Sequence, residues 1–244
     1  MKNICVDAGN TLIKIALSEE SAILSVVSFS CEDINGLMKY IGSLPKVDNC
    51  ILSRVGFVNQ AIIDALMLKS EHFMELTADT PIPFSNHYQT PETLGKDRLA
   101  AIAGAYSLFP DNDILVIDAG TALTIDFIDK NGNYLGGNIS PGLNMRFKAL
   151  HDYTEKLPLL SQTDEFQLLG KCTESAIVSG IQFGMIFEVN KYIDHFVKKN
   201  EHLVKILTGG DRFFLENKIE HSIFAEPNLV FIGLDYIIEF NRKR

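Results

Sequence analysis

The chain has 244 residues, of which 46% are hydrophobic and 22% are charged, a composition typical of a folded globular protein and not of a disordered one. Its formal net charge of -9 excludes a general attraction to nucleic acid, and the densest basic run, the closing NRKR, fits a solvated helix end. No eighteen uncharged apolar residues run together, and the start MKNICVD reaches an aspartate early. We therefore expect neither a membrane segment nor a signal peptide.

The cysteines bear on metal binding and on the cellular compartment. The four of them, at positions 5, 31, 50 and 172, lie far apart, with no CxxC pair and no histidine cluster nearby. This spacing does not favour a zinc site. It is typical of a protein in the reducing cytoplasm.

In the first half of the chain, residues 3–6 are typical of a strand, and the DAGNT turn follows it. The apolar residues Ile13, Ile15 and Leu17 then alternate with other residues, which predicts a second strand and hence a hairpin. Beyond it we expect a strand at 21–30, a helix at 32–44, a strand at 49–55 and a helix at 59–69.

Residues 77–98 contain three prolines and several turn formers, so we expect a surface loop there, followed by a helix at 99–109 rich in small residues. The segment PDND after this helix is the best domain boundary. We therefore predict an N-terminal domain over residues 1–112 and a C-terminal domain over residues 113–244. The whole is an α/β protein.

The second half begins like the first. DILVIDAGTALTIDFID predicts two strands joined by an acidic, glycine-containing turn, and Asn131 and Gly132 predict a tight hairpin before YLGGNISPG. A helix at 145–150, a long helix at about 174–199, a strand in VKILTGG and a closing helix in LDYIIEFNRK follow. The repeated opening indicates a duplicated α/β unit.

The two acidic turns are candidates for phosphate binding. Glycine lets a phosphate approach backbone amides, so Gly9 and Gly120 are suited to that contact. Aspartate beside a phosphate requires a cation between them, and Asp7 therefore implies a metal ion. A ligand-free Asx turn is the alternative for one motif alone, whereas two such turns could hold the phosphates of a nucleotide between the two halves. The sequence contains neither a P-loop motif nor a strand-linked GxGxxG, so neither of those nucleotide sites is expected.

A candidate acceptor site lies in GKDR, residues 95–98. A carboxylate that takes the proton of an alcohol assists phosphoryl transfer, and Asp97 is suited to this role. Arg98 could bind an acidic group through its guanidinium fork. Asp97 could equally be a helix cap, with Arg98 as its solvated neighbour.

The elements DAGNTLIK, HYQTPETLGKDR, DAGTALT, GGNISPG and TGGD occur in this order, and together they resemble the type III pantothenate kinases of bacteria. The resemblance extends over nearly the whole chain. It implies two ribonuclease H-like lobes of the acetate and sugar kinase/Hsp70/actin superfamily with an ATP cleft between them. It also implies a homodimer and ATP-dependent phosphorylation of pantothenate to 4'-phosphopantothenate, the first committed step of coenzyme A biosynthesis.

The resemblance also implies roles for individual residues. Asp97 would be the general base in an in-line transfer, Asp118 the ligand of a monovalent cation, K⁺ or NH₄⁺, and Mg²⁺ would accompany ATP. The residues implied to bind ATP are Asp7, Ala8, Gly9, Asn10, Thr11, Leu12, Ile13, Lys14 and Thr121. Those implied to bind pantothenate are Tyr88, Gly95, Lys96, Asp97, Arg98 and, in GKCTES, Thr173.

Several of these roles have simpler structural alternatives. Tyr88 could cover apolar surface, Thr173 could cap the long helix, and Asp118 could accept backbone hydrogen bonds at its turn. Lys96 stands where the family commonly has a small residue, so its part in the pocket is open. For the whole protein, a kinase of the same superfamily acting on another small alcohol, or a non-catalytic nucleotide-dependent regulatory protein, are the alternatives.

Overall fold

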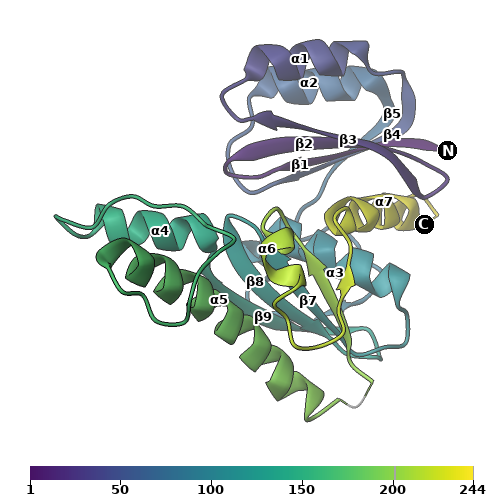
Figure 1. Ribbon diagram of the computed structural model, residues 1–244. Helices are drawn as coiled ribbons and strands as arrows, with labels where there is room; N and C mark the ends of the chain where they lie inside the picture. Colours follow the sequence, from purple (N-terminus) through teal and green to yellow (C-terminus); the bar gives the residue numbers. More distant parts are fainter. Residues whose placement is uncertain (201, 244) are drawn as a thin grey trace. The chain divides into compact units, whose positions relative to one another are not determined.

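The protein is described by a computed structural model in which residues 1–200 and 202–243 are placed, and the chain divides into two compact units (Figure 1). The first unit contains Met1–Asp111, Asn131–Leu135 and the chain from Asn228 onward. The second contains Asn112–Lys130 and Gly136–Pro227. The division into two lobes at residue 112 stays a prediction. The compact units are not continuous in sequence, because the closing helix packs against elements of the first unit.

The first unit is built on a five-stranded sheet in the order β3-β2-β1-β4-β5. β1, β2 and β3 are antiparallel neighbours, whereas β4 and β5 extend the sheet from β1 in parallel. The strands are β1 (Lys2–Ala8), β2 (Leu12–Glu19), β3 (Ala22–Ser30), β4 (Val47–Arg54) and β5 (Ser70–Glu75). The hairpin expected around DAGNT is therefore confirmed, with Asp7 one residue before the end of β1.

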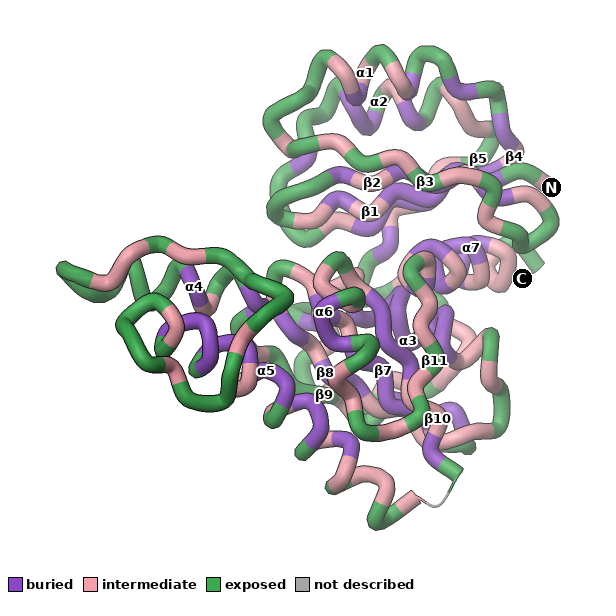
Figure 2. Tube along the Cα trace, viewed as in Figure 1, coloured by how far each residue is buried: buried purple, intermediate pink, exposed green. Residues whose placement is uncertain are grey.

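Helices cover both faces of this sheet. α1 (Ile34–Ser43) and α2 (Gln60–Lys69) lie on one face, and their apolar residues form a core with β1, β2 and β4 (Figures 1 and 2). On the other face lies α7 (Leu229–Arg242), whose buried Asp235 accepts a hydrogen bond from Asn3 at 2.8 Å and another from the Ser18 hydroxyl. Because a buried carboxylate needs such donors, this network fixes α7 to β1 and β2.

α3 and α7 are packed closely within the first unit. α3 (Lys96–Leu108) follows β6 (Ser85–Asn86) and the short 3₁₀ helix η1 (Pro91–Thr93). The two helices meet at Gly104 and Gly233, where an added β-carbon would overlap the Leu229 carbonyl and the Ala100 carbonyl, respectively. Glycine at both positions therefore lets the two backbones come into direct contact.

The second unit repeats the strand order of the first. Its sheet runs β11-β10-β7-β8-β9, in which β7 and β8 form an antiparallel hairpin and β10 and β11 extend the sheet from β7 in parallel. The first residues of β9 belong to the first unit and pair there with β6. The strands are β7 (Ile114–Ala119), β8 (Ala122–Ile128), β9 (Asn133–Pro141), β10 (Val204–Thr208) and β11 (Phe224–Ala225). The duplication predicted from the two similar openings thus extends to the whole sheet order.

The core of the second unit lies between this sheet and its helices. α4 (Leu143–Asp152), α5 (Thr173–Val197) and α6 (Arg212–Glu216) contribute Phe147, Met185 and Phe214, which are all buried against β7 and β8. The 25-residue α5 is the longest helix described. None of the helices described in residues 1–200 and 202–243 is long and apolar enough to cross a membrane.

Three sequence predictions differ from the structure in extent. The helix expected at 99–109 begins at Lys96, because the polar residues of GKDR form its first turn instead of ending the loop. The closing helix begins at Leu229, five residues before the expected start. The short strands β5 and β11 were not predicted, because β5 follows α2 without a break and β11 has only two residues.

The α3–α7 contact yields a stability prediction. Gly233→Ala places a β-carbon against the α3 backbone, so we expect a loss of about 1–3 kcal/mol of unfolding free energy. Gly42→Ala is the matched control, because Gly42 is exposed in α1 with no atom near an added β-carbon. Urea unfolding measures both variants. A Gly233→Ala protein as stable as the Gly42→Ala protein would contradict the close packing.

Candidate active site

The first candidate element is the turn between β1 and β2. Asp7 lies opposite Lys14 across the antiparallel pair and opposite Ser53 across the parallel pair with β4. The Gly9 N–H donates to the Leu12 carbonyl at 3.0 Å and closes the turn, which leaves the Asn10 and Thr11 side chains exposed. The side chains of Ala8 and Ile13 are buried in the core, so these two residues can offer a ligand only their backbone groups.

Asp7 lies close to a second carboxylate, Asp97, in the first turn of α3. Burial, and then the negative charge of Asp97, raise the pKa of Asp7 to about 6. Lys14 and the Ser53 hydroxyl, 3.5 Å from Asp7 Oδ1, act in the opposite direction but do not cancel the rise. The structure thus brings together Asp7, Lys14 and Asp97, which are up to ninety positions apart in the sequence.

This pair of acids has the chemistry of a site for a hard cation. Mg²⁺ prefers carboxylate oxygens, and in phosphate-handling sites one or two carboxylates usually hold it together with phosphate oxygens and water. Asp7 and Asp97 fit that number, and their mutual repulsion is relieved when a cation lies between them. Among the described residues, no group of three or more His, Cys, Asp or Glu side chains is placed to hold a metal ion.

Arg98 lies one residue beyond Asp97 and is 5% exposed. Its Nη2 donates to the Tyr134 hydroxyl at 3.2 Å, and its guanidinium carbon lies 5.5 Å from the centre of the Tyr88 ring. Three residues of the first unit, Tyr88, Arg98 and Tyr134, therefore form one cluster, which we call the Arg98 cluster. Arg98 is not the solvated neighbour of a cap.

Gly95 and Lys96 shape the start of α3. Gly95 is the N-cap and makes no side-chain cap hydrogen bond, while the Asp97 carboxylate accepts from the Arg98 backbone N–H at 2.8 Å. Asp97 is therefore not the N-cap itself. The Lys96 ammonium donates to the Leu94 carbonyl at 3.0 Å and to the Pro91 carbonyl at 3.4 Å. In this structure Lys96 holds the η1 turn that precedes the helix.

The second acidic turn lies in the second unit, between β7 and β8. The Gly120 N–H donates to the Ala122 carbonyl at 3.0 Å, and the Thr121 side chain is exposed. Asp118 Oδ1 lies near Gly120 and near Gly209, which has φ +94° and stands directly after β10. A β-carbon at Gly209 would overlap the Asp118 carboxylate and the Ala119 carbonyl. Glycine is therefore needed there for its positive φ and for the lack of space.

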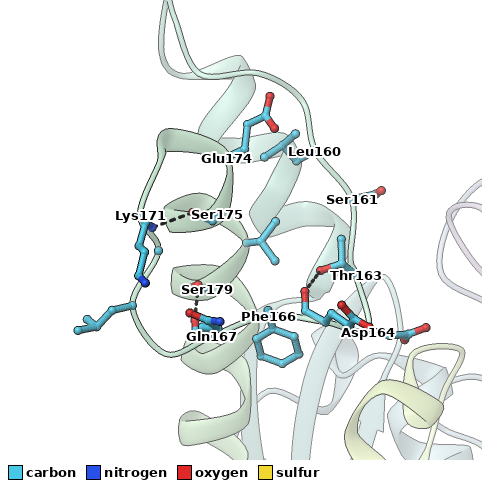
Figure 3. Close-up of a pocket in the computed structure, with 14 residues that line it drawn as sticks. Leu160, Ser161, Thr163, Asp164, Phe166, Gln167, Lys171, Glu174, Ser175 and Ser179 are labelled. Atoms are coloured by element: carbon cyan, nitrogen blue, oxygen red, sulfur yellow. Dashed lines mark hydrogen bonds between the residues drawn. The ribbon is translucent and has the colours of Figure 1, made fainter.

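Thr173 lies at the start of α5. A pocket of about 770 Å³ is lined by residues near this end of the helix (Figure 3). The segment that faces α5 here is fastened to it by Gln182, which exchanges two hydrogen bonds with the Thr163 backbone at 2.8 and 3.0 Å. Lys171 and Glu174 line the pocket on either side of Thr173. Thr173 itself is exposed and is not the N-cap, because Cys172 caps the helix in a capping box with Ser175.

Sequence reasoning missed three residues of these sites. The sequence pattern indicates only strands at Ser53 and Tyr134. Ser53 lies beside Asp7 through the strand register, and Tyr134 binds Arg98 through a contact between distant parts of the chain. Asp211 could have been found from the TGGD motif, in which it follows two glycines. Burial raises the pKa of its carboxyl group, and the hydrogen bond that the carboxylate accepts from the Leu143 N–H at the start of α4 lowers it by less. Asp211 therefore connects the end of β10 to α4.

Solved structures with a similar fold identify the class of protein. The chain matches a conserved Campylobacter jejuni protein assigned to the Baf family of transcriptional activators, with a TM-score of 0.63, 25% identity and coverage of 99% of this chain and 100% of that one. It also matches the activator of the 2-hydroxyisocaproyl-CoA dehydratase from Clostridium difficile with bound ADPNP, with a TM-score of 0.53, 13% identity and coverage of 100% and 98%. The fold is that of the acetate and sugar kinase/Hsp70/actin superfamily, as expected.

Sequence comparison then identifies the family. The profile of the type III pantothenate kinase family matches residues 3–195. The type III pantothenate kinase of Phocaeicola vulgatus is 42% identical over 241 residues, which cover 99% of each chain, and that of Bacteroides fragilis is 40% identical over 242 residues with the same coverage. The chain belongs to the type III pantothenate kinase family, and the resemblance noted in the sequence motifs is confirmed.

The raised pKa of Asp7 yields a prediction about stability and pH. Its pKa is about 6 in the folded protein against an ordinary value of 3.8, so between these values the folded state holds a proton that the unfolded chain has released. The stability that this proton provides is therefore lost as the pH rises through this window. Asp7→Asn stays neutral, so we expect it to gain up to about 3 kcal/mol over the wild type between pH 4 and pH 7.5.

Urea unfolding of the ligand-free, magnesium-free protein at the two pH values measures this gain. The exposed Asp79 provides the control variant Asp79→Asn, for which we expect the same pH dependence as for the wild type. If Asp7→Asn and Asp79→Asn respond to pH in the same way, the pKa of Asp7 is not raised in the folded protein, neither by burial nor by the charge of Asp97.

Proposed function

We propose that this protein transfers the γ-phosphoryl group of ATP to pantothenate and forms 4'-phosphopantothenate, the first committed step of coenzyme A biosynthesis. Its membership of the type III pantothenate kinase family supports the reaction. The fold supports the use of a nucleotide, since a related structure contains bound ADPNP. The enzyme would work in the cytoplasm, the compartment that its widely spaced cysteines favour.

The observation that carries the proposal is the position of Asp97 beside Asp7. Asp97 would act as the general base that takes the proton of the primary alcohol during in-line attack on the γ-phosphorus. A base of this kind contributes roughly 10²- to 10⁴-fold to the rate. Positioning of the reactants and stabilisation of the phosphoryl charge would supply the rest.

The turn at residues 7–14 would bind the ATP phosphates. Gly9, Asn10 and Thr11 offer backbone and side-chain donors at an accessible tip, and Lys14 brings a positive charge next to Asp7. Bound Mg²⁺ would neutralise the phosphate charge, held on the protein side by Asp7, which leaves Asp97 free to act as the base. In the second unit, the exposed Thr121 would contact ATP from its own turn.

The Arg98 cluster would form the pantothenate site. Arg98 carries a fixed positive charge that suits the substrate carboxylate, and Tyr88 offers an aromatic surface next to it. Gly95 and Lys96 would act by setting the start of α3, where Asp97 also lies. Thr173, at the start of α5 in the second unit, is the remaining residue that we assign to pantothenate binding.

A test of the reaction is phosphorylation by γ-labelled ATP of pantothenate and, in parallel, of a panel of small sugars and hydroxy acids. We expect product only with pantothenate, and we expect Asp97→Asn to lower kcat by about 10²- to 10⁴-fold while nucleotide binding stays measurable. The control is Glu92→Gln, which removes an exposed acid from η1, five residues before Asp97.

The outcomes of this assay separate the alternatives. Product with another alcohol would identify a different kinase of the same superfamily. Binding of ATP with no product from any acceptor would identify a nucleotide-dependent regulatory protein. An Asp97→Asn enzyme that turns over like the Glu92→Gln enzyme would remove Asp97 from the catalytic role and leave the substrate assignment intact.

We also propose that Asp118 binds a monovalent cation, K⁺ or NH₄⁺. Supporting this, its carboxylate oxygen lies close to Gly120 and Gly209, two residues that have no side chain of their own. We expect Asp118→Asn to lose the stimulation of kcat by K⁺ and NH₄⁺, because one charged ligand is removed from the site. Assays in sodium, potassium and ammonium salts at equal ionic strength measure the effect. An unchanged response to the three cations would mean that Asp118 is a structural acid.

A homodimer is the oligomeric state that we propose. The second unit exposes several large apolar side chains on α4, on α5 and on the segment between them, and exposed apolar surface of this kind is suited to a subunit contact. These residues are Met145, Tyr153, Leu159, Leu168, Leu169 and Phe187. Analytical ultracentrifugation decides this point, because a monomer would have the 27.2 kDa mass of the chain.

A further inference from the structure

Tyr134 is the largest side chain of the protein that is fully buried within the described residues, and it lies in the Arg98 cluster. Its hydroxyl accepts the hydrogen bond from Arg98 Nη2. Its ring stacks on that of Tyr88, with 6.2 Å between ring centres and 12° between planes. One buried side chain thus contacts two of the residues to which we assign pantothenate binding, Arg98 and Tyr88.

The backbone of Tyr134 is also connected to the loop that carries Tyr88. β9 begins at Asn133 and pairs in parallel with β6, so Tyr134 lies opposite Asn86. The His87 N–H donates to the Tyr134 carbonyl at 3.0 Å, and the Tyr88 N–H donates to Asn86 Oδ1 at 3.0 Å. The proline-containing loop therefore has a fixed position at Tyr88, through Tyr134 and its strand.

We propose that Tyr134 is a positioning residue for the pantothenate site: it sets the orientation of the Arg98 guanidinium through its hydroxyl and the plane of the Tyr88 ring through stacking. This inference rests on the proposed function. Tyr134 is fully buried, so it acts through its two neighbours and not by touching the substrate. An arginine held by a directed hydrogen bond and an aromatic face loses fewer orientations when it binds a carboxylate.

The test variant is Tyr134→Phe, which keeps the ring and the volume and removes only the hydroxyl, so the core can accommodate it. We expect the KM for pantothenate to rise about tenfold, since a hydrogen bond to a charged group is lost. The kcat and the KM for ATP stay within about twofold, because Asp97 and the β1–β2 turn are unchanged. Thermal unfolding and the far-UV spectrum report on folding.

Tyr40→Phe is the matched control. Tyr40 is on α1, in the same unit, and also pairs with another ring, that of Phe29 at 5.4 Å. We expect this variant to leave both KM values unchanged. A second arm combines Tyr134→Phe with Arg98→Lys. If Tyr134 acts through Arg98, the double variant has about the same KM for pantothenate as Arg98→Lys alone.

Each outcome bears on the inference. A KM for pantothenate within twofold of wild type in Tyr134→Phe, an equal rise in the KM for ATP, or multiplied effects in the double variant would each overturn it. A fall in stability without the KM difference would show a purely structural role and would overturn it too. A wild-type enzyme that forms no product from pantothenate overturns the proposed function and this inference together, whereas the other outcomes leave the proposed function standing.

Discussion

The repulsion between Asp7 and Asp97 is the constraint around which the first unit is organised. One acid lies at the end of a central strand and the other in the first turn of α3, so the fold keeps two like charges close at a cost in free energy. Two features hold them there: the sheet register, which places Lys14 and Ser53 beside Asp7, and the packing of α3 on α7. The proposed cation site would use this arrangement, because a bound cation relieves the repulsion between the two acids.

In the Arg98 cluster a buried charge is stabilised by a hydrogen bond and an aromatic ring. A buried guanidinium requires partners for its donors, and the fold supplies them in Tyr134 and in the face of Tyr88. Asp97 and Arg98 are adjacent in sequence, yet their side chains have different surroundings, one near another acid and the other among aromatic rings. A single turn of helix thereby serves both the proposed chemistry and the proposed binding of the acceptor.

The sequence predicted what depends on local pattern. The alternation after DAGNT and the repeated DAGT motif predicted both hairpins, and glycine with aspartate indicated which turns could meet phosphate. It could not predict Tyr134, because a tyrosine in a strand gives no sign of the arginine 36 residues earlier to which it will bind. Nor could it predict that Lys96 binds the carbonyls of η1, since that contact depends on how a proline-containing loop turns back.

The position of α7 has a consequence for biosynthesis. The sheet of the first unit is made within residues 2–75, but the helix that covers its second face and packs on α3 begins only at Leu229, after the whole of the second unit. The small-residue face of α3 and the Asn3 and Ser18 side chains, which donate to Asp235, therefore lack these partners on α7 while the ribosome makes the second unit. The first unit is thus completed only after the second unit has been translated.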